Sequence, residues 1–206
     1  MIEIDPSVSL GTGKHETTQL CIRQLLKYIR GNAEYTPENK APKVLDVGCG
    51  SGILAIAALK LGASFACATD IDEVAVDVAG ENMEINGLKP EQYQLYAGDL
   101  IENVAKDHSY TFSAPMTTER SVNGQKLSEL AGGGYDIVTA NILADVLIPL
   151  TPVICHQMKP GAFYITSGIL DVKEDVVVKA VKDAGLEVLE VTHQGEWVSV
   201  TARKQA

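Results

Sequence analysis

The stretch Val44-Leu45-Asp46-Val47-Gly48-Cys49-Gly50-Ser51-Gly52 decides the fold of this chain. A run with the character of a buried strand leads directly into three closely spaced glycines, and the apolar segment 53–61 that follows has the length of a helix. A strand, a glycine turn and a helix in this order bring bare backbone close to a ligand at the helix N-terminus. The stretch therefore predicts a parallel α/β unit with a ligand site at its turn.

The rest of the chain repeats this alternation of short β-branched runs and amphipathic stretches of helical period. It predicts an α/β, doubly wound, mostly parallel sheet with strands at 43–47, 65–69, 93–97, 135–140, 162–167, 187–192 and 196–202. Helices are expected from about 15–18 to 29 and at 53–61, 73–85, 144–158 and 172–184, the fourth bent or restarted at Pro149 and Pro152. Gln194-Gly195 lies between the last two strands at hairpin spacing, so the final strand is expected to be antiparallel.

Residues 107–134 interrupt this rhythm. The stretch is polar, carries Pro115 and Asn123-Gly124, and ends in Gly132-Gly133-Gly134. A connection of this length in a compact domain is either a functional lid or a surface insertion. We interpret it as a surface insertion in a single domain that spans residues 1–206.

The composition excludes several classes of protein. With 46% apolar and 21% charged residues, the chain has the make-up of a globular domain. The 27 acidic and 17 basic residues give a formal net charge of −10, which argues against nonspecific binding to nucleic acid or to anionic membranes. No apolar run approaches the roughly 20 residues that cross a bilayer, and the four cysteines lack metal-ligand or disulfide spacing. We therefore expect a soluble cytoplasmic protein without a metal site.

The charge of Asp46 indicates which ligand the glycine turn accepts. The segment 50–55 also matches the dinucleotide pattern G-x-G-x-x-A. However, a carboxylate two residues before Gly48 would face the pyrophosphate of a dinucleotide with like charge, whereas S-adenosylmethionine carries a sulfonium and an ammonium group and no phosphate. Charge matching favours S-adenosylmethionine, and an NAD-dependent oxidoreductase is the more distant alternative.

Further acidic residues stand at the ends of the next predicted strands. Asp70 lies eighteen residues past Gly52, where a carboxylate can accept hydrogen bonds from both ribose hydroxyls, and Asp72 could compete for this role. Asp99 follows the third strand and is placed to meet the adenine amino group. Each acid alone is equally well explained as a solvated loop carboxylate or a helix cap. Together with the glycine turn, they predict one cofactor site.

Four pieces of the sequence carry a resemblance to a known family. They are Asp5-Pro6 followed by Leu10-Gly11-Thr12-Gly13-Lys14-His15-Glu16-Thr17-Thr18; Asp46 with the glycine turn through Ala58; Asp70-Ile71-Asp72; and Ala140-Asn141-Ile142-Leu143-Ala144. With these pieces the chain resembles the catalytic domain of the class I S-adenosylmethionine-dependent methyltransferases, and more narrowly the ribosomal protein L11 methyltransferase family. The resemblance covers nearly all residues outside 107–134.

The resemblance implies a fold, a cofactor and a reaction. It implies a seven-stranded Rossmann-like sheet with the last strand antiparallel, and transfer of methyl groups to lysine side chains or an α-amine of a ribosomal protein, with S-adenosylhomocysteine as product. It implies no direct contact with nucleic acid. The family motifs carry over to a cofactor set of Thr18, Gly48, Asp70 and Asn141, which Asp46, Gly50, Ile71 and Asp99 complete.

The expected mechanism combines proximity with desolvation. Asn141 follows a buried strand, where its amide oxygen can accept a hydrogen bond from an incoming amine and orient the lone pair. Thr17 or Thr18 opens a helix and can cap it or reach the amino-acid end of the cofactor. Lysine must lose its proton before it attacks, and of the histidines only His15 is expected near the site, with a capping role equally plausible. The Asn141-Ile142-Leu143 motif offers no aromatic ring for a methylated cation, and Trp197 and Tyr164 are expected to be core or sheet-face residues.

Two other functions use the same fold. Family members carry an additional N-terminal domain that recognises the substrate, whereas this chain starts almost at the catalytic domain. This difference is compatible with a methyltransferase that acts on a small molecule. It is equally compatible with a cofactor-binding module that has no independent turnover.

Overall fold

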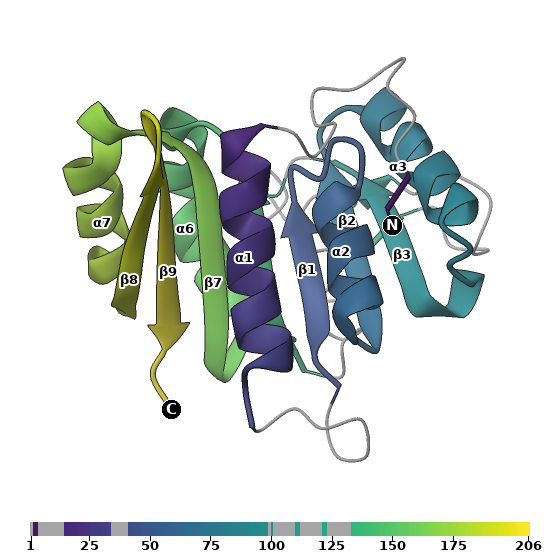
Figure 1. Cartoon of the computed structure of the whole chain (residues 1–206), viewed down its shortest axis with the longest axis horizontal. Helices are drawn as coiled ribbons and strands as arrows, with labels where there is room; N and C mark the ends of the chain where they lie inside the picture. The colour runs from purple at the N-terminus through teal and green to yellow at the C-terminus, as the bar shows by residue number, and fades with distance from the viewer. Residues whose placement is uncertain are drawn as a thin grey trace.

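The computed structural model describes residues 2–3, 15–33, 41–98, 100, 110–111, 121–122 and 133–206. In this part of the chain nine strands form one sheet in the order β5-β4-β3-β2-β1-β6-β7-β9-β8 (Figure 1). The strands are β1 Lys43–Val47, β2 Phe65–Asp70, β3 Tyr93–Ala97, β4 Tyr110–Thr111, β5 Ser121–Val122, β6 Tyr135–Asn141, β7 Met158–Leu170, β8 Leu186–Gln194 and β9 Trp197–Lys204.

The sheet contains the predicted seven-stranded arrangement. Without the two-residue strands β4 and β5, the order is β3-β2-β1-β6-β7-β9-β8, and β9 is antiparallel to both of its neighbours. This confirms the doubly wound, mostly parallel sheet with an antiparallel last strand. The segment 107–134 contributes β4, which pairs antiparallel with β3, and β5 at the sheet edge. The rest of that segment, up to residue 132, lies outside the described residues.

Helices cover both faces of the sheet. α1 Glu16–Arg30, α2 Ile53–Leu61 and α3 Glu73–Ile85 lie on one face, and α6 Ala144–Gln157 and α7 Glu174–Asp183 lie on the other (Figure 1). Short 3-10 turns precede β3, at Pro90–Gln92, and α7, at Asp171–Lys173. Two apolar clusters fill the layers, one between the sheet and α1, α2 and α3, the other between the sheet and α6 and α7. Among the described helices, none combines the length and the apolar character needed to span a bilayer.

The predicted helices and strands are present, and most begin and end within two residues of the predicted bounds; α6 differs in its continuity and β7 in its length. α6 runs as a single helix through Pro149 and Pro152 and does not restart there. Its buried residues Leu147, Leu150 and Ile154 hold it against the sheet, and this packing outweighs the backbone hydrogen bonds that proline cannot donate. β7 is longer than predicted because it continues past an irregularity in its pairing with β9 to the Leu170–Trp197 pair.

The strand order places the site. β1 pairs in parallel with β2 on one side and with β6 on the other. The chain therefore leaves β1 toward one half of the sheet and later returns to build the other half beside it. In open α/β sheets, ligands bind at this point of reversal, beyond the carboxyl ends of the strands.

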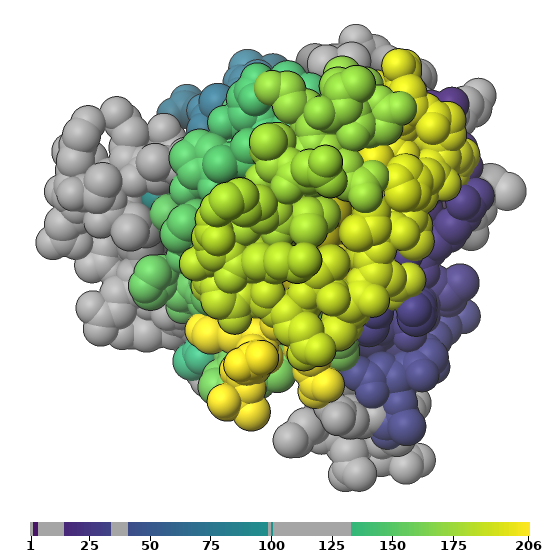
Figure 2. Space-filling model, turned by 90° about the vertical axis from the view of Figure 1, so that its left-hand side faces the viewer, coloured from purple at the N-terminus to yellow at the C-terminus, as the bar shows by residue number. Residues whose placement is uncertain are grey.

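The C-terminal hairpin of β8 and β9 packs beside the first helix. Figure 2 shows the C-terminal strands, in yellow and yellow-green, next to α1, in purple. Side chains of α1 reach the hairpin at Glu190 and Gln194. Residues far apart in the sequence therefore form one wall of the molecule.

Candidate active site

The glycine turn after β1 has a backbone that only glycine adopts easily. Gly48, Gly50 and Gly52 have φ values of 67°, 51° and 75°, in the left-handed region. At Gly48 a Cβ atom would also lie 2.5 Å from Cγ2 of Ile142, so a side chain there would require Ile142 to move. The turn is thus fixed both by its conformation and by its neighbour.

The carboxylate of Asp70 holds this turn from the end of β2. Its Oδ2 accepts a hydrogen bond from Gly50 N at 2.9 Å and its Oδ1 accepts one from Asp72 N at 3.1 Å. Asp72 has a different role, because its own carboxylate accepts from Val74 N at 2.9 Å and caps α3. The structure therefore places Asp70 at the turn and Asp72 at the start of the helix.

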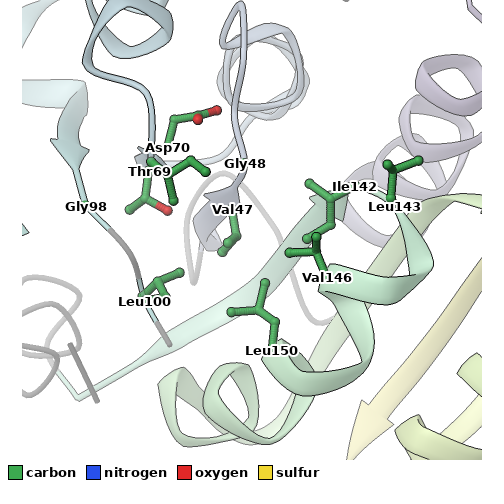
Figure 3. A pocket seen from close by; sticks show the side chains of 11 residues that line it. Val47, Gly48, Thr69, Asp70, Gly98, Leu100, Ile142, Leu143, Val146 and Leu150 are labelled. Atoms are coloured by element: carbon green, nitrogen blue, oxygen red, sulfur yellow. The ribbon is translucent and has the colours of Figure 1, made fainter. Parts of the chain in front are cut away.

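A cavity of about 340 Å³ opens beside this carboxylate (Figure 3). Its described lining residues are Val47, Gly48, Thr69, Asp70, Ile71, Gly98, Leu100, Ile142, Leu143, Val146 and Leu150. Thr69 and Asp70 are the two polar side chains among them, so the walls are largely apolar. Ile71 is 76% exposed at the rim. Asp99 lies outside the described residues, although Gly98 and Leu100 on either side of it line the cavity.

Asp46 takes a position beneath the turn. Its side chain is 1% exposed; Oδ2 accepts a hydrogen bond from Ala55 N at 3.2 Å, and Oδ1 accepts one from the Thr139 hydroxyl at 2.7 Å. Burial raises the pKa of this carboxyl to about 6, although both hydrogen bonds favour the charged form. Asp46 thus ties β1 to α2 and β6 and lines neither cavity described here, so a contact of this residue with a cofactor stays a prediction.

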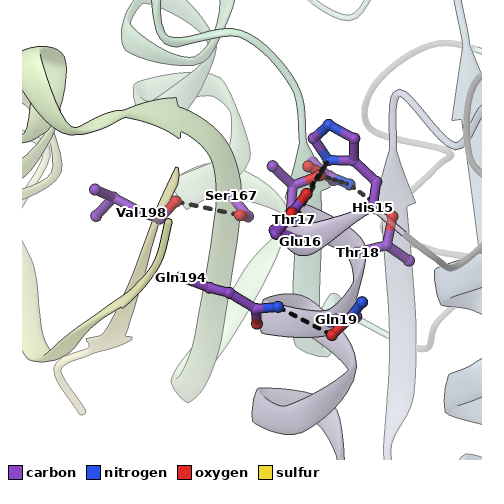
Figure 4. Close-up of polar contacts among 9 residues, drawn as sticks. His15, Glu16, Thr17, Thr18, Gln19, Ser167, Gln194 and Val198 are labelled. Carbon is purple, nitrogen blue, oxygen red and sulfur yellow. Dashed lines mark hydrogen bonds and ion pairs between the residues drawn. The ribbon is translucent and has the colours of Figure 1, made fainter. Parts of the chain in front are cut away.

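Asn141 joins the end of β6 to the start of α1. Its amide Nδ2 donates to Oγ1 of Thr17 at 3.2 Å and to Oγ1 of Thr18 at 3.4 Å. His15, not a threonine, caps α1: its Nδ1 accepts from Thr17 N at 3.4 Å and lies 2.9 Å from Thr17 Oγ1 (Figure 4). The capping interpretation of His15 is therefore confirmed, and the threonine hydroxyls face Asn141 instead. Residues 4–14 of the N-terminal motif lie outside the described part of the chain.

A second cavity, of about 250 Å³, lies at this junction. It is lined by His15, Thr17, Thr18, Asn141, Ile142, Leu143, Gly168 and Trp197. Ile142 and Leu143 line both cavities, so the two share one apolar wall.

Trp197 is the first residue of β9 and pairs with Gln194 across the hairpin, which agrees with the predicted sheet-face position. It also lines the second cavity, which was not predicted, and meets the His15 ring edge-on, with 5.2 Å between centroids. The aromatic ring that the Asn141-Ile142-Leu143 motif lacks thus comes from the far end of the chain. Tyr164 is fully buried, as predicted.

Sequence reasoning also missed Ile142, Leu143 and Gly168 as site residues. Leu143 is an apolar side chain that is 64% exposed, and its place two residues after Asn141 was the available signal. Gly168 has a φ of +80°, and a Cβ there would lie 2.7 Å from the carbonyl oxygen of Ile142. This close backbone approach depends on the packing of β7 against β6, which the sequence alone does not display.

Comparison with known proteins agrees with this geometry. The family model described as "Ribosomal protein L11 methyltransferase (PrmA)" matches residues 1–205. A relative from Agathobacter rectalis named ribosomal protein L11 methyltransferase is 50% identical over 204 residues, which cover 99% of this chain and 55% of the relative. A relative of the same name from Lachnospira eligens is 42% identical and covers 100% of this chain and 56% of its own length. The chain thus spans about half the length of the curated relatives it matches.

A solved structure supports the same assignment. The crystal structure of ribosomal protein L11 methylase from Lactobacillus delbrueckii subsp. bulgaricus has a TM-score of 0.74 and 28% sequence identity, and the match covers 100% of this chain and 86% of that one. Together, the family model, the sequence identities and the shared fold show that the chain belongs to the ribosomal protein L11 methyltransferase family.

Proposed function

We propose that this chain transfers methyl groups from S-adenosylmethionine to amines of a ribosomal protein. The observation that carries the proposal is the pair of adjoining cavities at the carboxyl ends of β1, β2 and β6, which share Ile142 and Leu143 as a common wall. A reaction between two separately bound molecules requires two such neighbouring sites.

The first cavity suits the adenosine part of the cofactor. Its apolar walls suit a flat base, since ligand pockets combine apolar surface with few polar groups. Asp70 lies at one end with both oxygens already held by backbone N–H groups, which fixes the carboxylate for the two ribose hydroxyls. Ile71 at the rim would cover the base, and the amino-acid end would extend past Ile142 toward Thr18 and Asn141, which line the second cavity. When bound, S-adenosylmethionine supplies a methyl group on a positively charged sulfur.

The second cavity suits the accepting amine. Asn141 uses its Nδ2 toward Thr17 and Thr18, and within the described part of the chain nothing donates to its Oδ1, which would accept a hydrogen bond from an amine N–H. Trp197 presents an aromatic ring to the same cavity, where cation–π attraction would hold an amine that gains positive charge on methylation. Ile142 and Leu143 keep water from the space between the two cavities, and this desolvation favours the neutral amine. The chain's own residues therefore orient the nucleophile and exclude water.

Support for a protein acceptor comes from the family and from charge. The relatives are named for ribosomal protein L11, and a chain with a net charge of −10 attracts a lysine-rich partner. A small-molecule acceptor is the alternative outcome of the test.

The test is a labelled-methyl transfer assay on the wild-type chain. Purified ribosomal protein L11, a mixture of small-molecule amines and a whole-cell extract are offered separately, with Asn141→Ala as the control variant. The proposal predicts label in L11 with several turnovers per chain, and little label with Asn141→Ala. Label in a small molecule alone would replace the acceptor. Binding of S-adenosylhomocysteine without any transfer would reduce the chain to a cofactor-binding module.

A further inference from the structure

Four positions of α1 form one row that faces the C-terminal hairpin. His15, at the cap, is followed at intervals of four residues by Gln19, Arg23 and Lys27. Residues four apart lie on the same face of a helix. Each of the four meets the hairpin: His15 contacts the ring of Trp197, Gln19 and Arg23 contact Gln194, and Lys27 contacts Glu190.

Gln194 uses both ends of its amide in this row. Its Nε2 donates to Gln19 Oε1 at 3.0 Å (Figure 4), and its Oε1 accepts from a guanidinium nitrogen of Arg23 at 3.0 Å. Gln194 is also the direct partner of Trp197 across the β8–β9 pair. Gln194, the residue opposite Trp197 in the hairpin, thus forms hydrogen bonds to two successive turns of α1.

These contacts join the two elements that lie on opposite sides of the second cavity. His15, Thr17 and Thr18 in the first turn of α1 form one side, and Trp197 in the hairpin forms the other. Beneath the row, Thr192, Ser199 and Thr201 have buried hydroxyls with no partner among the described residues. Because a buried hydroxyl without a hydrogen bond costs free energy, these three residues stabilise the packing of α1 on the hairpin less than apolar residues would, and the polar contacts of the row add to it.

We propose that Gln194 is a positioning residue for the second cavity, the proposed site of the accepting amine and called the acceptor cavity below. It sets the distance between Trp197 and the first turn of α1. The inference rests on the proposed function, because it assigns Gln194 a role in acceptor binding at the site proposed above. Gln194 lines neither cavity itself and acts through Gln19 and Arg23.

The chain supplies a matched control at the other end of α1. Glu190 Oε1 accepts hydrogen bonds from Lys27 Nζ and Tyr28 OH, both at 2.6 Å. This contact also joins α1 to the hairpin, but its residues lie three turns of helix away from His15 and line neither cavity. Glu190→Gln therefore weakens the same interface without touching the cavity.

The experiment compares Gln194→Ala with Glu190→Gln in three measurements on the whole chain. These are the KM and kcat for the protein acceptor, the affinity for S-adenosylhomocysteine, and the emission of Trp197, which is the chain's single tryptophan. For Gln194→Ala we expect KM for the protein acceptor to rise about 3- to 10-fold, because one to two polar contacts are lost. The affinity for S-adenosylhomocysteine should be unchanged. The emission of Trp197 should shift to the red, because water reaches the ring. For Glu190→Gln we expect KM and emission as in the wild type.

Two further variants test whether the effect comes from the contacts between Gln194 and α1. Gln194→Glu retains an acceptor for Arg23 and should restore most of the KM. Gln19→Ala removes the hydrogen bond to Gln194 from the helix side. It replaces Gln194→Ala in the three measurements if Gln194→Ala does not fold. Unchanged KM and emission in Gln194→Ala, or equal changes in both hairpin variants, would overturn the inference. If the wild-type chain shows no methyl transfer, the proposed function fails, while the emission comparison still decides whether Gln194 positions Trp197.

Discussion

The side-chain amide of Asn141 lies 3.2 Å from the hydroxyl of Thr17, so the last residue of β6 and the first turn of α1 share a hydrogen bond. This bond joins a strand at the point of chain reversal to a helix from the start of the described chain. It fixes the amide plane beside the second cavity, where the nitrogen faces the helix and no donor among the described residues bonds the oxygen.

Asn141→Ala should separate catalysis from binding. The substitution removes the group that orients the amine, and we expect methyl transfer to fall about 10- to 100-fold, since misplaced reactants lose rate on this scale. Affinity for S-adenosylhomocysteine, measured by calorimetry, should change much less. Thr17→Val serves as the control, because it removes one partner of the amide and leaves the amide in place. Equal losses of rate and affinity in Asn141→Ala would contradict this division of roles.

Asp70→Ala should act on the cofactor. A carboxylate that accepts hydrogen bonds from ligand hydroxyls contributes roughly 1.5–3 kcal/mol per bond, so we expect affinity for S-adenosylhomocysteine to fall at least tens-fold. Asp72→Ala is the matched variant two residues away. It removes the cap of α3 and should lower the free energy of unfolding by about 1 kcal/mol, with cofactor affinity retained. The assignment of Asp70 is wrong if the two variants lose affinity to the same extent.

Gly48→Ala tests the close approach of the glycine turn to Ile142. Gly48 and Gly87 have nearly the same φ, 67° and 68°, but a Cβ at Gly87 meets nothing within 4 Å. Alanine at either position bears the left-handed strain of about 1–2 kcal/mol. Only Gly48→Ala should add a clash and lose cofactor affinity, as thermal melts and calorimetry together can show. Identical melts and affinities for the two variants would mean that Ile142 yields freely.

The buried carboxyl of Asp46 predicts a pH dependence of stability. Because burial raises its pKa from 3.8 to about 6, the folded state binds a proton more tightly than the unfolded state between these values. The contribution of Asp46 to stability is therefore highest below about pH 4 and declines as pH rises through about 6, by on the order of 3 kcal/mol.

Asp46→Asn removes this titration and can keep both contacts, with its oxygen accepting from Ala55 N and its amide donating to the Thr139 hydroxyl. Urea unfolding of both proteins at pH 4.5, 5.5 and 7 should show the wild type losing stability relative to the variant as pH rises. Parallel stability curves would show that Asp46 does not titrate in this range.

Local patterns explain why much of the fold could be predicted. The unit from β1 to α2 follows from a buried run, three glycines and an apolar helix, all adjacent in sequence, and the hairpin follows from Gln194-Gly195. The acceptor cavity could not be predicted in this way. Trp197 contacts His15, although the two residues lie near opposite ends of the sequence. Gly168 comes close to Ile142 only because β7 packs beside β6.

The prediction for Asp46 shows a second limit. Its charge suggested the kind of ligand, but a residue in a strand points to one face or the other according to its register, and Asp46 points toward α2 and Thr139. The carboxyl group of Asp46 is therefore buried beneath the glycine turn. Among the residues that the structure describes, Asp70, at the end of the next strand, is the carboxylate that lines the first cavity.

We propose that the first cavity, beside Asp70 and the glycine turn, holds an adenosyl cofactor. The most direct test of this proposal is a calorimetric titration of the wild-type chain with S-adenosylhomocysteine, repeated in the presence of excess NAD. We expect S-adenosylhomocysteine to bind saturably at one site per chain, and we expect NAD not to displace it. Tight binding of NAD, with no heat from S-adenosylhomocysteine, would contradict it.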